Sequence, residues 1–237
     1  MDRYTIEISE NIASKYRIEW NLSLNEAISL HSLILKLNII TMFRPLSETS
    51  YGISIKTLSG LKFMLINSSN TIGRQNFTIA HELFHLYVEK NPIPHICSLN
   101  KGKNNSEKNA DLFASSFLMP KTAIYSFLSD EEINKKTVFT STTLKMEQYF
   151  NVSHSALIIR LKQLKLLSES QFNDLMFNTQ VKEVSKSLGY KTTLYENGNE
   201  GLIIGDYIEK ANQLLEQDLI SEGHHLSLIN TIFYGEN

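Results

Sequence analysis

The stretch Phe77-Thr78-Ile79-Ala80-His81-Glu82-Leu83-Phe84-His85-Leu86-Tyr87-Val88 contains no helix breaker and decides the fold. Apolar side chains at steps of three and four predict a core helix; they are Phe77, Ala80, Phe84 and Val88. His81 and His85 are four residues apart, so a helix places both imidazoles on one face. Glu82 can reach a water molecule held where the imidazoles meet. This His-Glu-x-x-His pattern suits a zinc ion, with Glu82 as general base.

The alternative for this motif is a core helix with two partly buried, hydrogen-bonded histidines and no metal ion. Histidine and glutamate side chains on so apolar a helix need polar partners, because burial without partners is costly. A metal ion supplies those partners, and we therefore favour the metal site.

A catalytic zinc site keeps one position open for water and takes three protein ligands, so a further ligand is required downstream. The segment from Glu107 to Pro120 predicts a second helix from its apolar spacing, with Ala110, Phe113, Ala114, Phe117 and Leu118 in register. Glu107 would complete a His-His-Glu site. Asp111, one turn further on, could accept the second ring N–H of a ligand histidine and fix its tautomer. The alternative is a solvated Glu107 favoured by the helix dipole; the upstream motif favours the ligand.

The two motifs together resemble the ImmA/IrrE-type zinc metallopeptidases of bacteria and their mobile elements. The matching residues are Arg74-Gln75-Asn76-Phe77-Thr78-Ile79-Ala80-His81-Glu82, Glu107-x-x-Ala110-Asp111-x-Phe113-Ala114 and Leu118-Met119-Pro120. The resemblance covers roughly residues 20 to 165. It departs at Leu83-Phe84, which are large and apolar where relatives often carry a small or polar residue. We also expect no N-terminal repressor-like DNA-binding domain, which many relatives carry.

This resemblance implies specific roles. His81, His85 and Glu107 would bind zinc, for which manganese is the alternative metal. Glu82 would be the catalytic base. The implied substrate is a helix-turn-helix repressor, whose cleavage switches on the genes that it silences.

Composition and charge narrow the class of protein. Hydrophobic residues make up 42% and charged residues 20% of the 237 residues, as in an ordinary soluble globular protein. The net charge of -2 gives no support for nucleic-acid binding by the whole protein. No apolar run approaches the roughly 18 residues of a membrane span, and the N-terminus is too charged for a secretory signal. We therefore expect a cytoplasmic protein with no membrane partner.

Cysteine usage agrees with a reducing compartment. Cys97 is the single cysteine, which excludes an intrachain disulfide. A bystander thiol is favoured over a metal ligand or redox sensor. Cys97 lies in a long polar segment, Asn91 to Ser106, which predicts either a gating loop or a disordered connector. His95 in that loop and Tyr87 and Tyr125 are candidate transition-state donors, although solvent exposure or packing is favoured for each.

Strand patterns precede the metal helix. Ile39 to Phe43 is rich in β-branched residues, and Tyr51 to Lys56 alternates as a half-exposed strand. Ser59-Gly60 is a turn signal before a further strand from Leu61 to Ile66, so these last two strands predict a hairpin. The fold class is α+β: a small, mostly antiparallel sheet with zinc-peptidase helices, followed by helix-turn-helix-like and C-terminal helical regions. The predicted divisions are 1–135, a zinc metallopeptidase domain; 136–168, helix-turn-helix-like; and 169–237, mainly helical.

Other local signals predict further helices and connections. Ser23 and Glu26 have the spacing of a capping box before an apolar helix, and Ser129 to Lys136 is a charged connector. Phe172 to Leu188 is a helical region closed by Gly189, and Ile208 to Leu219 is an amphipathic helix. His224-His225 is a solvated turn, since the pair lacks the other ligands of a metal site.

Ser141 to Leu164 has helix-turn-helix form. Asn151 tolerates the left-handed turn, Val152 packs inward and Ser153 caps the second helix. DNA binding would place Ser153, His154 and Ser155 near base edges. Few basic residues lie at the start of the second helix, so packing or recognition of a protein partner is favoured over DNA.

The function predicted from these observations is zinc-dependent hydrolysis of a peptide bond in a transcriptional repressor, which derepresses the target genes. The predicted hydrolysis is inferred from the residues, and the repressor as substrate is inferred from the resemblance alone. Two alternatives remain: a non-catalytic anti-repressor that sequesters the repressor, and a DNA-binding regulator whose zinc site is structural or sensory.

Overall fold

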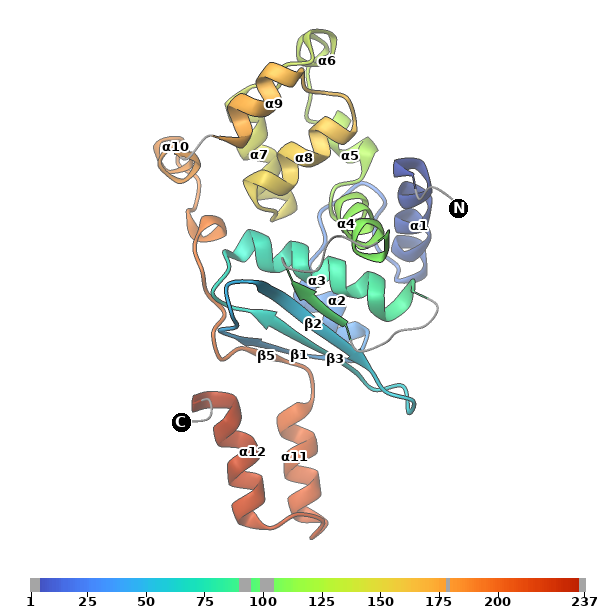
Figure 1. Ribbon diagram of the computed structural model, residues 1–237, viewed down its shortest axis with the longest axis vertical. Coiled ribbons are helices and arrows are strands. Elements are labelled where there is room, and N and C mark those ends of the chain that lie inside the picture. The colour runs from blue at the N-terminus through green and yellow to red at the C-terminus, as the bar shows by residue number, and fades with distance from the viewer. Residues whose placement is uncertain (1–4, 90–94, 99–104, 178–179, 235–237) are drawn as a thin grey trace.

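The computed structural model describes residues 5–89, 95–98, 105–177 and 180–234. These residues form helices around one small sheet, which confirms the predicted α+β class (Figure 1). The helices are α1 (Ile6–Glu19), α2 (Leu30–Lys36), α3 (Ile72–Tyr87), α4 (Asn105–Leu118), α5 (Lys121–Tyr125), α6 (Asp130–Lys135), α7 (Thr140–Phe150), α8 (His154–Gln163), α9 (Glu169–Met176), α10 (Val181–Ser187), the 3-10 turn η1 (Thr193–Tyr195), α11 (Tyr207–Glu216) and α12 (Glu222–Tyr234). The strands are β1 (Ile39–Arg44), β2 (Ser50–Lys56), β3 (Lys62–Asn67), β4 (His95–Ser98) and β5 (Ile203–Ile204).

The sheet has the strand order β4-β2-β3-β1-β5. The β1–β3 pair is parallel, whereas the β2–β3, β2–β4 and β1–β5 pairs are antiparallel, so the sheet is mostly antiparallel as predicted. The predicted hairpin is the β2–β3 pair, and Gly60 takes a φ of 89° in its turn, a conformation that glycine adopts without steric cost. Helix α3 runs across one face of the sheet (Figure 1).

The two outermost strands come from segments where we predicted none. β4 lies within the predicted loop Asn91 to Ser106, so that prediction was wrong for these four residues, and its backbone pairs with β2. The predictions for the side chains of His95 and Cys97 lie outside the described part of the structure. β5 comes from the region predicted as C-terminal and mainly helical, and it pairs with β1. The same region also contacts the start of α3, where the carbonyl of Glu196 accepts the backbone N–H of Ile72 at 2.8 Å. Strands of two and four residues are too short for a local alternating pattern, because pairing with distant residues defines them.

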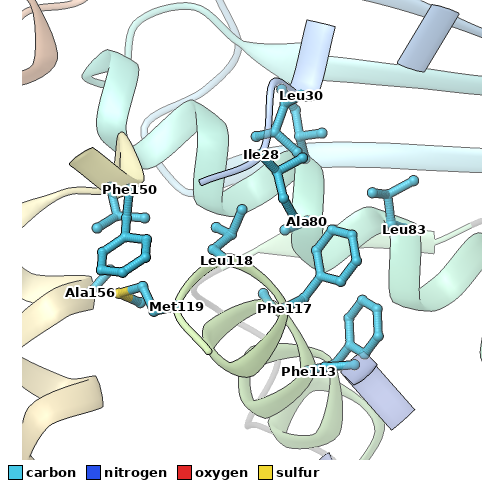
Figure 2. Close-up of a cluster of buried hydrophobic side chains, with 14 of the residues drawn as sticks. Ile28, Leu30, Ala80, Leu83, Phe113, Phe117, Leu118, Met119, Phe150 and Ala156 are labelled. Carbon is cyan, nitrogen blue, oxygen red and sulfur yellow. The ribbon is translucent and has the colours of Figure 1, made fainter. Parts of the chain in front are cut away.

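A buried apolar cluster holds the two long central helices together. Ala80 and Leu83 of α3 are fully buried, as are Phe113 and Phe117 of α4, and Figure 2 shows these side chains meeting between the helices. Trp20, after α1, adds an edge contact to Phe117 with ring centroids 5.5 Å apart. Burying one large aromatic or aliphatic side chain stabilises a fold by about 1.5–3 kcal/mol. This packing fixes the relative position of α3 and α4.

Arg17 explains why the capping box predicted at Ser23 and Glu26 does not form. Its buried guanidinium donates to the carbonyl of Phe117 at 2.8 Å, to that of Glu26 at 2.9 Å and to that of Ser23. Burial lowers the pKa of Arg17 to about 10. The carbonyls of Ser23 and Glu26 therefore point toward the Arg17 guanidinium. Helix α2 begins only at Leu30.

The two predicted helices of the helix-turn-helix-like region are α7 and α8. Asn151 joins them with a φ of 53°, Val152 is fully buried, and the Ser153 hydroxyl accepts the N–H of Ala156 at 3.4 Å. This turn packs on the start of α3: a Cβ added to Gly73 would lie 2.7 Å from the nitrogen of Ser153. The start of α8 therefore contacts helix α3.

Three helical details differ from the sequence predictions. The charged connector Ser129 to Lys136 is the helix α6, in which Ser129 and Glu132 form a capping box. The region Phe172 to Leu188 contains two helices, α9 and α10, and Gly189 follows the second with a φ of 79°. His224-His225 lies in the first turn of α12 and not in a turn between elements. Among the described residues, no helix has both the length and the apolarity to cross a bilayer.

Candidate metal centre

Helix α3 buries three ionisable side chains in its second half. His81, Glu82 and His85 expose 3%, 0% and 1% of their surface, whereas histidine and glutamate usually remain at least partly solvated. Helix α3 has no side-chain cap at Thr71. Instead, the buried Gln75 amide donates to the carbonyls of Asn70 at 2.7 Å and Gly198 at 3.0 Å, which anchors the loops around the start of the helix.

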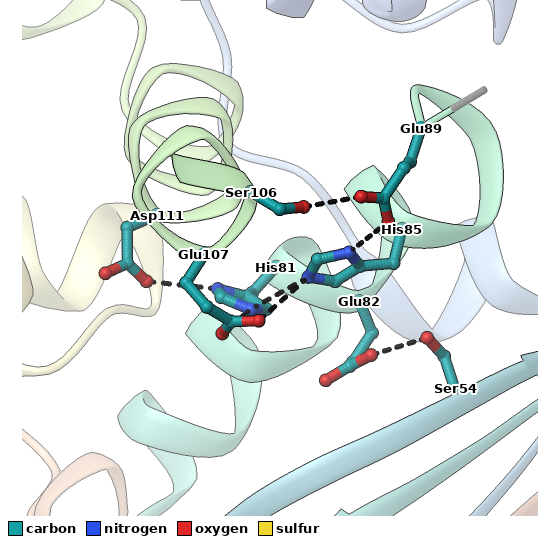
Figure 3. A network of polar contacts seen from close by, with 8 residues as sticks. All are labelled: Ser54, His81, Glu82, His85, Glu89, Ser106, Glu107 and Asp111. Carbon is teal, nitrogen blue, oxygen red and sulfur yellow. Dashed lines mark hydrogen bonds and ion pairs between the residues drawn. The ribbon is translucent and has the colours of Figure 1, made fainter. Parts of the chain in front are cut away.

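The structure brings the three predicted ligands together (Figure 3). His81, His85 and Glu107 each offer one atom to a cluster in which all atoms lie within 4.8 Å of one another. His81 Nε2 lies 3.2 Å from His85 Nε2 and 3.4 Å from Glu107 Oε2, and His85 Nε2 lies 4.0 Å from Glu107 Oε1. Ligand atoms about 2.0–2.1 Å from a tetrahedral zinc ion lie about 3.3–3.4 Å from one another. The His81–His85 and His81–Glu107 distances are close to this spacing, and the His85–Glu107 distance is longer, so the three donors lie near three corners of a zinc tetrahedron.

The other nitrogen of each imidazole contacts a carboxylate. His81 Nδ1 lies 3.0 Å from Asp111 Oδ1, and His85 Nδ1 lies 2.8 Å from Glu89 Oε2. A carboxylate only accepts hydrogen bonds, so each Nδ1 carries the proton and each Nε2 presents a lone pair in the neutral ring. Two such lone pairs and the Glu107 carboxylate converge on one point. A cation removes that electrostatic conflict, and this donor set fits zinc.

Glu89 and Ser106 belong to this network, although we did not predict them. Ser106 Oγ donates to Glu89 Oε1 at 2.6 Å, so the carboxylate that orients His85 is itself held by the residue before Glu107. The spacing of His85 and Glu89, four residues apart, was a usable signal. No local signal identifies Ser106, because its contact joins the start of α4 to a residue that follows the end of α3.

Glu82 lies on the side of the imidazoles that faces the sheet (Figure 3). Its Oε2 accepts a hydrogen bond from Ser54 Oγ of β2 at 2.5 Å. Gly52 and Ser54 are buried, whereas Tyr51 and Ile53 are only half-buried and Ile55 is exposed. The small and polar residues of β2 therefore face α3, opposite to the usual burial of the apolar residues in an alternating strand. The reason is the close approach of a helix that carries a buried carboxylate.

The tyrosine candidates have packing contacts. Tyr87 OH donates to the carbonyl of Leu37 at 3.4 Å, and its ring packs on the edge of Trp20. Burial raises the pKa of Tyr87 to about 12, and the charge of Glu19 adds to this effect. Tyr125 lies beneath the ammonium of Lys121. These contacts agree with the packing roles that we favoured.

The comparisons with known proteins bear on the same segment. Residues 35–162 match the family model of the IrrE N-terminal-like domain, Peptidase M78. This match spans over half of the chain and includes all of His81, Glu82, His85 and Glu107. No curated protein matches the chain significantly. Peptidases of this family are typically zinc-dependent, in agreement with the buried His-His-Glu cluster. The chain belongs to the IrrE N-terminal-like Peptidase M78 family, a family of the metallopeptidase type.

Proposed function

We propose that this protein is a zinc-dependent endopeptidase that cleaves a helix-turn-helix transcriptional repressor and so derepresses its target genes. One observation carries the peptidase part: the buried Glu82 carboxylate adjoins a cluster of two imidazoles and one carboxylate whose donor atoms lie within 4.8 Å of one another. Within the described residues this cluster has three members, the number that catalytic zinc sites use.

The residues would divide the chemistry between them. His81, His85 and Glu107 would hold the zinc ion, which when bound supplies a Lewis acid that polarises a carbonyl and acidifies water. Glu82 would accept a proton from the attacking water at its carboxylate and deliver it to the leaving amine. Asp111 and Glu89 would keep the two imidazoles in the tautomer that binds metal.

The repressor as substrate is supported by the resemblance of the motifs to ImmA/IrrE-type peptidases. The geometry of α7 and α8 supports a packing role for this unit over DNA binding. His154 Nε2 contacts the carbonyl of Leu175 at 2.9 Å, and the fully buried Arg160 pairs with Glu10 and donates to the carbonyl of Met119 at 3.0 Å. Two polar side chains that could have contacted DNA are thus used within the protein.

The test is to incubate the purified protein with the repressor encoded beside its gene, in the presence of zinc or manganese. We expect cleavage by the wild type and none by Glu82→Gln, with equal metal content in both proteins. Glu209→Gln, on the exposed surface of α11, is the matched control and should cleave normally. Equal relief of repression by wild type and Glu82→Gln without cleavage would instead establish the non-catalytic anti-repressor.

A further inference from the structure

Strand β2 provides a rigid platform beside the general base. It lies between β3 and β4 and pairs with both in antiparallel register. Ser54 is paired with Met64 on one side and with the backbone of His95 on the other. A residue in the interior of a sheet has little backbone freedom, because neighbouring strands define its position on both sides. The hydroxyl of Ser54 is therefore presented from a fixed point.

The hydrogen bond from Ser54 to Glu82 joins two buried side chains. Ser54 exposes 2% of its surface and Glu82 none, and Oγ lies 2.5 Å from Oε2. The hydroxyl is the donor, because an ionised carboxylate can only accept. Such charge-assisted bonds are short and strong, and the low dielectric of a buried site strengthens them further. This bond restricts rotation of the Glu82 carboxylate.

Gly52 allows this contact to form. Gly52 and Ser54 are two residues apart and both face α3. A Cβ on Gly52 would lie 2.7 Å from Thr78 Cγ2, 3.2 Å from the carbonyl oxygen of Leu65 and 3.4 Å from Glu82 Oε1. A side chain at position 52 would push β2 and α3 apart. The absence of a side chain there lets the strand come close enough for Ser54 to reach Glu82.

We propose that Ser54 is a positioning residue for Glu82: it holds the carboxylate in the orientation that general-base catalysis requires, and Gly52 provides the space. This inference rests on the proposed peptidase function. A general base must lie within about 2.6–3.2 Å of the proton that it accepts. A displacement of about 1 Å can reduce the rate about 100-fold. The restraint from Ser54 therefore acts on turnover and not on the metal ligands, which other residues orient.

The test compares Ser54→Ala, Ser54→Thr and a matched control. Ser54→Ala removes the donor, and we expect kcat to fall about 10- to 100-fold with KM and metal content unchanged. Ser54→Thr retains a hydroxyl and should recover most of the rate. Ser68→Ala is the control, since Ser68 is also buried beside the sheet but its hydroxyl has no hydrogen-bond partner. Unchanged kcat in Ser54→Ala, or no recovery in a folded Ser54→Thr, overturns the proposal.

A crystal structure of metal-loaded Ser54→Ala gives a reading that does not depend on activity. We expect the Glu82 side chain in more than one rotamer, while His81, His85 and Glu107 keep their positions. A single, unchanged Glu82 rotamer overturns the positioning role. Failure of the proposed function is distinguishable, because the wild type itself would then not cleave. If Ser54→Ala does not fold, Ser54→Cys, with similar volume and a weaker donor, replaces it in both measurements.

Discussion

Nε2 of His81 lies 3.2 Å from Nε2 of His85, and both nitrogens face the carboxylate of Glu107. Carboxylates hold the proton on each Nδ1, so both Nε2 atoms present lone pairs. These lone pairs and the Glu107 carboxylate repel one another unless a cation lies between them. Stability should therefore depend on metal.

The first prediction concerns metal removal. A chelator should lower the melting temperature, because metal binds the folded chain: ligand at about 100 times its dissociation constant stabilises by about 2.7 kcal/mol. Differential scanning fluorimetry with and without added zinc measures the shift. His224→Ala/His225→Ala is the control and should respond as the wild type does. A zinc-loaded protein whose melting temperature equals that of the apo form would contradict this prediction.

The second prediction concerns the carboxylates behind the imidazoles. Glu89→Gln and Asp111→Asn each retain shape but lose the charge that holds the Nδ1 proton, so zinc affinity should fall about 10- to 100-fold. Competition with a chromophoric chelator measures this change. Glu131→Gln, which disturbs only an exposed pair with Lys135, should bind zinc normally. Wild-type affinity in both test variants would show that the network does not orient the ligands.

The third prediction concerns pH and a contact far from the metal site. Burial alone would lower the pKa of His154, but the hydrogen bond and charge of Glu147 and the carbonyl of Leu175 outweigh burial and raise that pKa. A histidine with a raised pKa stabilises the folded state fully below its unfolded value of about 6.5. This stabilisation is lost as the pH rises through the folded pKa.

His154→Gln should therefore reduce the free energy of unfolding more at pH 6 than at pH 8. Urea denaturation at both values measures the difference. His31→Gln, on an exposed position of α2, is the matched control against which the two losses are compared. An equal loss at both pH values would mean that the His154 contact contributes no charge-dependent stability.

The fourth prediction concerns the contact between α3 and the helix-turn-helix-like region. A Cβ on Gly73 would lie 2.7 Å from the nitrogen and 2.9 Å from the Cα of Ser153, and backbone atoms there cannot move aside easily. Gly73→Ala should destabilise the protein by about 1–3 kcal/mol despite the better helix propensity of alanine.

Gly223→Ala is the matched control for that substitution. Gly223 also lies in a helix, but a Cβ there meets nothing closer than Ser221 Oγ at 4.0 Å. This variant should be neutral or more stable by up to about 1 kcal/mol. Urea denaturation compares both variants, and equal stabilities would contradict the close packing of α3 against α8.

Long helices with strong periodicity were predictable from local pattern. α3 and α4 were expected from apolar spacing, and the caps at Asn151 and Ser153 from residue type. Errors occurred where a distant residue changed the local outcome. The backbone of Ser23 and Glu26 binds the guanidinium of Arg17, so the helix starts later than its capping signal suggested.

The sequence by itself determined which side chains could meet at a metal ion. The spacing of His81 and His85 follows from the helical repeat, and Glu107 and Asp111 lie on one face of another helix for the same reason. Each of these relations is local, so the repeat of the backbone is enough to derive it. The family match is likewise a match of sequence, over residues 35–162.

Only the tertiary structure decided which residues support that group. Ser54, in the sheet, bonds to Glu82, which lies 28 positions away in the sequence. Ser106, in helix α4, bonds to Glu89, which lies 17 positions away. Gly52 and Ser54 of β2 are buried, and Ile53 between them is only half-buried, because α3 packs closely on the face of the strand that carries Gly52 and Ser54. Such contacts arise from packing between elements, and packing depends on the whole folded chain and not on the pattern within any one segment.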